Sequence, residues 1–323
     1  MRTIIASMSC VVGLASSPTA VAQQNYPTKP ITMVVPAEPG GVTDIVARTI
    51  STRLSEKLGQ SVLIDNRGGA SGVIGTEFAA RAAPDGYTLL VTPPPAAVIV
   101  PHYRKVPYDT LKDFVPVTLI VTSPNTVVVS PRVGVDNIKE LIALAKKDPK
   151  ALSYGSAGYG APDSLAGRMF NKLAGVTIAE VPYKGAGPAM TALLGDHIQM
   201  MLAPTTMTLP YIRDGRIKAL AVTAEKRSKA MPDVPTLIES GIDVDVVSFF
   251  GVLAPTGTPQ SVIDKLQTTI AGILKEPKVR ESFEKDGGDV IGSTPAEFGD
   301  FLREQYASFG DILKQVGITG QGK

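Results

Sequence analysis

Short apolar runs alternate with helical patterns through the first third of the chain. The run at 30–36 is bounded by prolines, which is typical of a short buried strand. The stretch 44–58 follows and is predicted to be a helix that ends at the glycine directly after it, because its apolar residues have helical spacing: Ile45, Val46, Ile50, Leu54 and Leu58. In chain order we predict strands at 30–36, 61–64 and 87–92, with helices at 44–58 and 73–83 between them. This order predicts a parallel sheet with helices on both faces.

A second series of strands and helices follows between residues 133 and 223. It predicts strands at 152–154, 177–181, 197–203 and 217–223, and helices at 138–147, 164–174 and 188–194. This stretch is long enough to form a domain with a core of its own.

Two long, β-branched apolar stretches fit neither series, and each lies where one series gives way to the other. They cover 115–130 and 246–254, and we expect both to cross between the two units and to act as a hinge. The last helices, at 260–275, 277–286 and 295–316, would then return to the first unit. The predicted fold class is α/β, with lobe 1 at 23–123 plus 250–323 and lobe 2 at 124–249. Two consecutive domains are the alternative, but no flexible linker separates the two series.

The first 22 residues have the features of a secretory signal peptide. Arg2 gives a positive start, 4–14 is mostly apolar or small, and Ala20-Val21-Ala22 places small residues where a signal peptidase cleaves. A short membrane anchor is the alternative, but this apolar run is shorter than the roughly 18–20 residues that a span requires. We therefore expect cleavage after Ala22, a periplasmic location, and no membrane span in the mature chain.

Composition and charge argue against several classes of protein. The chain has 323 residues, 44% of them hydrophobic, which is enough for two cores. Its 32 basic residues against 30 acidic ones leave a net charge of +2, so nucleic acid is not an expected partner. With Cys10 inside the predicted signal peptide and only His102 and His197 as histidines, no metal site is expected. Neither a Walker sequence nor a G-x-S-x-G elbow is present, so we expect no cofactor and no catalysis.

Three loops rich in small residues stand between a predicted strand and the start of a predicted helix. They cover 36–44, 155–163 and 183–188, and each contains at least two glycines. In open parallel sheets, ligands bind where strand ends meet helix starts, and the free N–H groups of a helix start attract anions. Four or five such N–H groups at roughly 1.5–3 kcal/mol each could hold a carboxylate at micromolar affinity, which needs about 8 kcal/mol. Ordinary connecting loops, glycine-rich only for packing, are the alternative.

Several short stretches match a known family in order along the chain. They are 26–31, Pro39-Gly40-Gly41 with Asp44 and Arg48, 65–67, 84–89, 181–185, 219–223 and 232–236. In these stretches the sequence resembles the Bordetella-uptake-gene (Bug) family, the extracytoplasmic solute receptors of tripartite tricarboxylate transporters. The resemblance covers essentially the whole mature chain.

The resemblance implies a fold, a ligand class and a partner. The fold would be that of a type II periplasmic binding protein, with a small carboxylate held between two lobes by backbone groups and water. Family members bind dicarboxylates, tricarboxylates, acidic amino acids, nicotinate-like acids or aromatic acids, and we expect a monomer that serves the membrane permease subunits of such a transporter. The predicted ligand-binding residues are Ala37, Gly40, Gly41, Val42, Thr43, Asp44, Pro94, Ser156, Ala157, Gly158, Tyr159, Gly160, Ala161, Ser164, Lys184, Ala203 and Pro204.

The sequence departs from the family pattern at four positions. Ala37 stands where the family commonly has Phe, Ser164 where it has His, Ala203 where it has Asp, and Phe249 where it has Trp. Smaller side chains and a missing acid predict a roomier site, suited to a bulky or aromatic mono- or dicarboxylate such as terephthalate. Tyr159 would stack on such a ring, or would be an ordinary exposed loop residue.

Two other functions fit parts of the sequence. The protein could present its bound acid to a periplasmic sensor, since that role needs the same closed form. It could also be a periplasmic enzyme that uses Asp44 or Asp163 with Lys184, although no pairing of a nucleophile with a base is visible.

Overall fold

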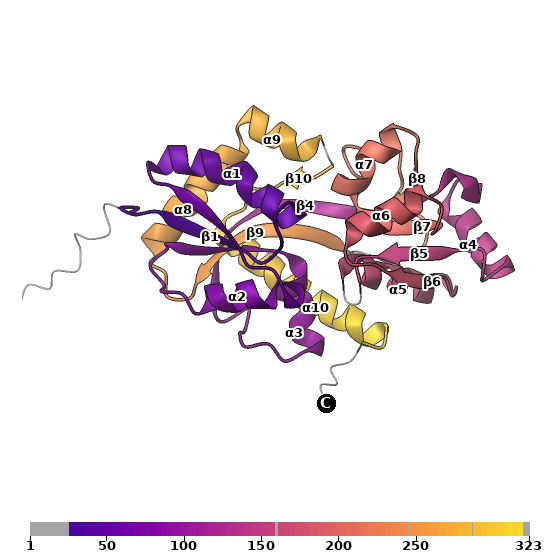
Figure 1. Ribbon diagram of the computed structural model, residues 1–323, viewed down its shortest axis with the longest axis horizontal. Helices are drawn as coiled ribbons and strands as arrows, with labels where there is room; N and C mark the ends of the chain where they lie inside the picture. Colours follow the sequence, from indigo (N-terminus) through magenta and orange to yellow (C-terminus); the bar gives the residue numbers. More distant parts are fainter. Residues whose placement is uncertain (1–25, 159–160, 245, 286, 319–323) are drawn as a thin grey trace, which may run out of the picture.

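The computed structural model describes residues 26–158, 161–244, 246–285 and 287–318. The predicted signal peptide at 1–22 lies outside these residues, as do Tyr159 and Gly160. Figure 1 shows two lobes side by side, with two long strands running from one into the other. Within the described residues, no helix has the length and apolar character that a membrane crossing requires.

Lobe 1 is built on a parallel sheet in the order β2-β1-β3. Its strands are β1 (Ile31–Val35), β2 (Val62–Asn66) and β3 (Thr88–Thr92), and its first helices are α1 (Val42–Leu58) and α2 (Val73–Ala80), with the short turn η1 (Ala70–Gly72) between β2 and α2. Buried Val46, Ile50 and Leu54 fix the inner face of α1, which ends where Gly59 takes a left-handed φ of 66°. After β3 come the π-helical turn η2 (Pro95–Ile99) and α3 (Val100–Tyr103).

Lobe 2 has its own sheet, in which β5 lies between β6 and β7. Its elements are η3 (Pro131–Val133), α4 (Ile138–Lys147), β5 (Ser153–Ser156), α5 (Pro162–Ala174), β6 (Ala179–Pro182), α6 (Ala186–Leu194), β7 (Met200–Pro204), α7 (Thr205–Arg213) and β8 (Lys218–Val222). Ser156 pairs with Pro182, and Gly155 with Met201, so the carboxyl ends of the three parallel strands lie together at one edge.

Two strands, β4 (Phe114–Val129) and β9 (Val247–Pro255), connect the lobes. The first part of β4 pairs antiparallel with β9, from Phe114↔Pro255 to Pro124↔Val247. From Asn125 onward, β4 pairs with β7 and, from Thr126, with β8 instead. Fully buried Asn125 marks the change, because its amide nitrogen Nδ2 donates to the Val246 carbonyl at 3.2 Å.

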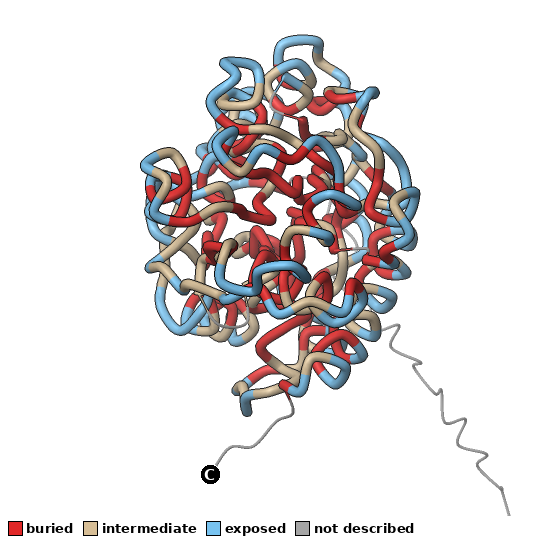
Figure 2. Tube along the Cα trace, turned by 90° about the vertical axis from the view of Figure 1, so that its right-hand side faces the viewer, coloured by how far each residue is buried: buried red, intermediate tan, exposed pale blue. Residues whose placement is uncertain are grey.

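The chain then returns to lobe 1 through α8 (Gln260–Leu274), α9 (Pro277–Glu284), β10 (Asp289–Val290) and α10 (Pro295–Gln315). The predicted fold class, two α/β lobes with two crossing strands, is therefore confirmed for the described residues. Figure 2, seen from the lobe 2 side, shows buried positions mainly in the interior and exposed positions mainly on the outer turns.

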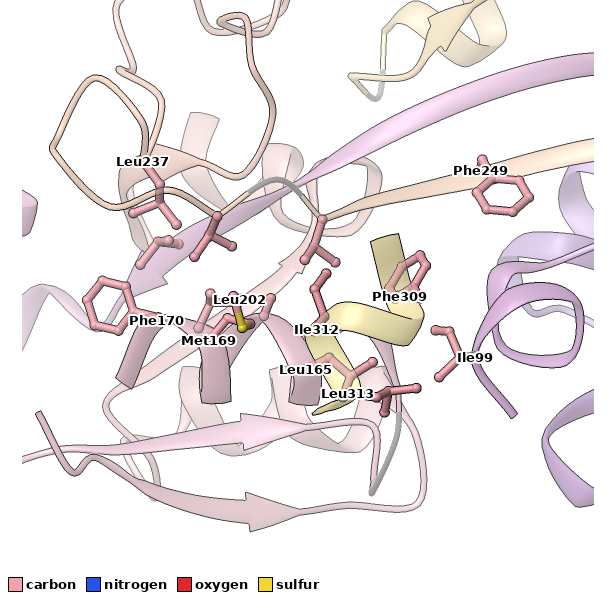
Figure 3. Close-up of a cluster of buried hydrophobic side chains, with 14 of the residues drawn as sticks. Ile99, Leu165, Met169, Phe170, Leu202, Leu237, Phe249, Phe309, Ile312 and Leu313 are labelled. Carbon is pink, nitrogen blue, oxygen red and sulfur yellow. The ribbon is translucent and has the colours of Figure 1, made fainter. Parts of the chain in front are cut away.

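One hydrophobic cluster spans both lobes. Ile312 and Leu313 of α10 lie beside Leu165 of α5, and Phe309 and Met169 belong to the same cluster (Figure 3). The Nζ atom of Lys172 in α5 also donates to the carbonyl of Gln315, at 2.8 Å. The far end of α10 therefore connects the lobes at a second place, apart from the crossing strands.

Sequence patterns missed two helical segments. The segment 95–103 lies in a stretch with three consecutive prolines at 93–95, and α7 contains Pro210 together with several threonines. Both compositions disfavour helix on local propensity alone, so packing against the sheets decides the structure here. On α1, Ile45 is 55% exposed, whereas Val46, Ile50 and Leu54 of the same helix are buried.

Candidate ligand-binding site

A cavity of about 510 Å³ lies between the lobes, where α1, α6 and α7 begin. The crossing strands form its floor and α9 closes one side. Lobe 1 and the crossing strands contribute Gly40, Gly41, Val42, Ile45, Val46, Thr49, Val121, Ser123, Phe250, Ser282 and Phe283, and lobe 2 contributes Ala186, Gly187, Thr206 and Met207.

The loop before α1 is held by the carboxylate of Asp44. Its Oδ2 atom accepts from the Gly40 N–H at 2.9 Å and from Arg48 Nε at 2.8 Å, while Oδ1 accepts from Asn66 Nδ2 at 3.0 Å. The hydrogen bond from Arg48 is the main reason that the pKa of Asp44 falls to about 2. Asp44 is itself buried, so it fixes the loop and does not reach into the cavity.

Gly40 and Gly41 play different parts in this loop. Gly40 has a φ of 82°, a left-handed conformation that glycine adopts without strain. Gly41 has an ordinary φ of −74° as the N-cap of α1, and a Cβ atom added there would lie 3.4 Å from the Glu38 carbonyl oxygen, an ordinary van der Waals distance. The backbone at Gly41 is therefore open toward the cavity without any need for glycine in the fold itself.

The loop before α5 is held in the same manner by Asp163. Its Oδ2 atom accepts from the Ala157 N–H at 2.7 Å, and its Oδ1 atom accepts from the Ser164 N–H at 3.0 Å. Burial is the main cause that raises the pKa of Asp163 to about 6, with a smaller contribution from the negative charge of Glu180. The loops before α1 and α5 are therefore held in the same way. In each, the carboxylate of a buried aspartate accepts a hydrogen bond from a backbone N–H of the loop.

Glu180 of β6 anchors this second loop and was missed by the sequence analysis. Its Oε1 atom accepts from the hydroxyls of Ser156 at 2.8 Å and Ser164 at 2.6 Å, and its Oε2 atom lies 2.7 Å from Arg168. No motif surrounds Glu180 in the sequence. Only the pairing of β5 with β6 brings it beside the loop.

The structure brings some of the predicted site residues together and leaves others apart. Gly40, Gly41 and Val42 are in the cavity wall, with Lys184 exposed two residues before Ala186. The described wall does not include Ala37, Thr43, Asp44, Pro94, Ser156, Ala157, Gly158, Ala161, Ser164, Ala203 or Pro204. Ser164 and Ala203 are fully buried inside lobe 2, and Phe249 is fully buried against Phe301. The space expected from these substitutions therefore does not open into the described cavity.

Most of the wall consists of residues that the sequence analysis missed. They include Ile45, Met207, Phe250 and Phe283, which look like core positions in the sequence. One signal was available, because Ile45 falls beside the buried stripe of α1 that Val46, Ile50 and Leu54 define.

The cavity wall is chemically suited to binding a small anion. None of its described residues carries a charge, and the Thr206 hydroxyl is buried without a hydrogen-bond partner among the described residues. The described part of the chain also contains no group of three or more His, Cys, Asp or Glu side chains that could hold a metal ion. Helix starts, one free hydroxyl and apolar side chains can bind a small anion with an apolar portion.

The model of the tripartite tricarboxylate transporter family receptor matches residues 46–318. The chain belongs to this family. Protein BugT of Bordetella pertussis is 34% identical over 98% of both chains. The structure of the periplasmic binding protein BugD has a TM-score of 0.80 and 37% identity, covering 92% of this chain and all of its own. An R. palustris protein solved with adipate has a TM-score of 0.83 and 34% identity, with the same coverage.

Membership of this receptor family confirms the resemblance seen in the sequence, and these structures confirm the periplasmic-binding-protein fold. Because the family consists of transport receptors, the cavity between the lobes is the candidate place for a transported ligand.

Proposed function

We propose that this protein is a periplasmic receptor that captures a small carboxylate between its lobes and delivers it to the permease subunits of a tripartite tricarboxylate-type transporter. The observation that supports this most is the cavity at the starts of α1, α6 and α7. Helix starts from both lobes converge there, and their dipoles and N–H groups favour a negative charge.

The same geometry argues for binding without catalysis. Asp44 and Asp163, the acids that a catalytic mechanism would need, are buried and bound to their own loops. Lys184 is exposed at the surface of lobe 2. A general base must reach its substrate directly or through one water molecule, and neither carboxylate faces the cavity.

The proposed ligand is a bulky or aromatic carboxylate, and terephthalate is one example. Support comes from the size of the cavity and from its aromatic and aliphatic wall, which includes Phe250, Phe283 and Ile45. It does not come from Ala203 or Ser164, because both are enclosed in lobe 2.

The function is tested by a thermal-shift screen of aliphatic and aromatic carboxylates, followed by recovery of the acid. A receptor shows a raised melting temperature with at least one acid, and chromatography returns that acid unchanged. Conversion of the acid would contradict the receptor role, and a flat screen across the carboxylates would contradict carboxylate capture.

A further inference from the structure

The start of α7 carries a buried hydroxyl that has no hydrogen-bond partner within the described part of the chain. It belongs to Thr206, the second residue of this helix, which lies in the wall of the interlobe cavity. We propose that Thr206 is a specificity-determining residue, whose hydroxyl donates to a carboxylate oxygen of the captured acid. This inference rests on the proposed function and adds a ligand contact from lobe 2.

The other hydroxyl side chains in the described wall already have acceptors. Thr49 Oγ1 donates to the backbone carbonyl one turn earlier in α1 at 2.8 Å, and Ser282 Oγ donates to the carbonyl one turn earlier in α9 at 2.6 Å. Ser123 Oγ makes a longer contact, of 3.4 Å, with the carbonyl of the next residue in β4. Thr206 is therefore the wall residue whose hydroxyl proton has no acceptor among the described residues.

Two neighbouring threonines of α7 differ from Thr206 in this respect. Thr205 Oγ1 donates to the Pro124 carbonyl at 2.9 Å, and Thr208 Oγ1 donates to the Thr205 carbonyl at 3.3 Å. Both of these side chains are fully buried, and neither belongs to the described cavity wall. Of the three threonines, the one that lines the cavity is thus the one without an acceptor in the described residues.

A buried hydroxyl without an acceptor costs free energy, because it has lost its hydrogen bonds with water and gained none in the protein. A carboxylate oxygen of a bound acid removes this cost. The N–H groups at the start of α7 have no partners within the helix, so they can donate to the same carboxylate. A molecule without an oxygen at this place would leave the hydroxyl unpaired and would bind less tightly. Thr206 therefore contributes to the choice of ligand as well as to its affinity.

The test replaces the hydroxyl of Thr206 by a methyl group of nearly the same size. Titration calorimetry at constant ionic strength and pH 7.5 measures the binding of adipate, benzoate and terephthalate, and the variants are compared with the acid that binds the wild type most tightly. We expect Thr206→Val to lower the affinity at least fivefold, whereas Thr206→Ser, which keeps the hydroxyl, binds within twofold of the wild type. A smaller loss in Thr206→Val, or an equal loss in Thr206→Ser, would overturn the inference.

The stability of the ligand-free variants separates a ligand contact from a purely structural role. Thr206→Val removes an unpaired buried hydroxyl, so its melting temperature without acid should be at least that of the wild type. Thr208→Val is the matched control, because it removes a paired hydroxyl of the same helix outside the described wall, and its affinity should stay within twofold of the wild type. A lowered melting temperature of Thr206→Val, or equal losses of affinity in both variants, would show that the hydroxyl supports the helix and would contradict a ligand contact.

Failure of the inference can be distinguished from failure of the proposed function. If the wild type binds none of the three acids, the inference is overturned, and the function then depends on the wider screen alone. If the wild type and Thr206→Val bind one of these acids equally well, the receptor function holds and Thr206 does not contact the ligand.

Discussion

At the scale of single residues, the two glycines before α1 separate what the fold needs from what a ligand needs. Gly40 has a left-handed φ, so any substitution there strains the loop. Gly41 has a φ that all residues adopt, and its position is exposed toward the cavity. Gly158 resembles Gly40, with a φ of 113°, and is therefore a poor place to test binding.

We predict that Gly41→Val lowers affinity for the captured acid at least tenfold and leaves the fold intact. The branched side chain fills space beside the start of α1, while an N-cap change of this kind costs at most about 1 kcal/mol. Calorimetry measures the affinity and thermal denaturation measures the fold. Gly272→Val on α8 is the control, since Gly272 has open space around it and is not part of the described cavity wall. Equal affinity of Gly41→Val and the wild type would contradict a backbone contact at this site.

The pKa of Asp163 leads to a second prediction for a single residue, which concerns the pH dependence of stability. Burial raises the pKa of Asp163 in the folded state to about 6, above the ordinary aspartate value of 3.8, so the folded state binds more protons than the unfolded state between these two values. The contribution of Asp163 to stability is therefore present at low pH and lost as the pH rises through 6. On lowering the pH from 7 to 5, Asp163 therefore raises the free energy of unfolding by about 1 kcal/mol.

The measurement is the free energy of unfolding in urea at pH 7 and pH 5, for the wild type and Asp163→Asn. We expect the wild type to gain about 1 kcal/mol relative to the variant on going to pH 5. Asp44, with a pKa of about 2, stays ionised over this window and does not contribute. His102, whose pKa burial lowers, is common to both proteins and cancels. Parallel pH profiles of the two proteins would show that Asp163 does not titrate in this range.

At the scale of elements, hydrophobic spacing predicted most of the fold, because most apolar residues that follow a strand or helix period are the residues that the structure buries. The order from β1 to β3 follows from apolar runs and helical stripes that the sheet does bury. α7 and the segment 95–103 could not be predicted, because prolines and threonines oppose their helical structure locally and only tertiary packing stabilises it.

The candidate site divides in the same way. Two of the predicted loops, at 36–44 and 183–188, contribute to the cavity wall, because each places small residues between a strand and a helix start, whereas the described residues of the loop at 155–163 do not. The rest of the wall could not be predicted, because Phe250 and Phe283 are apolar residues within apolar stretches, and a cavity residue of this kind has the same sequence pattern as a core residue. The anchoring of Ser156 and Ser164 by Glu180 depends on strand pairing, which single-sequence periodicity does not specify.

The two halves of α10 should respond differently to the loss of a buried leucine. Leu313 lies beside Leu165 of lobe 2 (Figure 3), whereas Leu302 follows Phe298, whose ring packs on Gly251 of β9. We predict that Leu313→Ala and Leu302→Ala each cost about 2–5 kcal/mol of unfolding free energy. Only Leu313→Ala should also weaken the packing between the two lobes. The expected result is a larger radius of gyration, measured by X-ray scattering of the ligand-free protein. Equal radii for the two variants would mean that α10 does not restrain the lobes.

At the scale of the whole molecule, the lobes are connected in two places, by the crossing strands and by the far end of α10. β4 and β9 cross at the floor of the cavity, and the far end of α10 packs on α5. The starts of α1, α6 and α7 contact the cavity from both lobes. Rotation about the crossing strands would therefore change the width of the cavity more than it changes the packed contacts.

A ligand that touches both lobes shifts the molecule toward a narrower cavity, by as much as it binds the closed form more tightly than the open form. We therefore predict that the acid found in the screen lowers the radius of gyration measured by X-ray scattering. Gly41→Val, at the same acid concentration, should stay at the ligand-free radius, because its contact with the acid is blocked. The radius should fall with the same midpoint as the calorimetric titration, since one equilibrium governs both signals. Heat of binding without any contraction would contradict closure, and it would mean that the acid enters a cavity that is already formed.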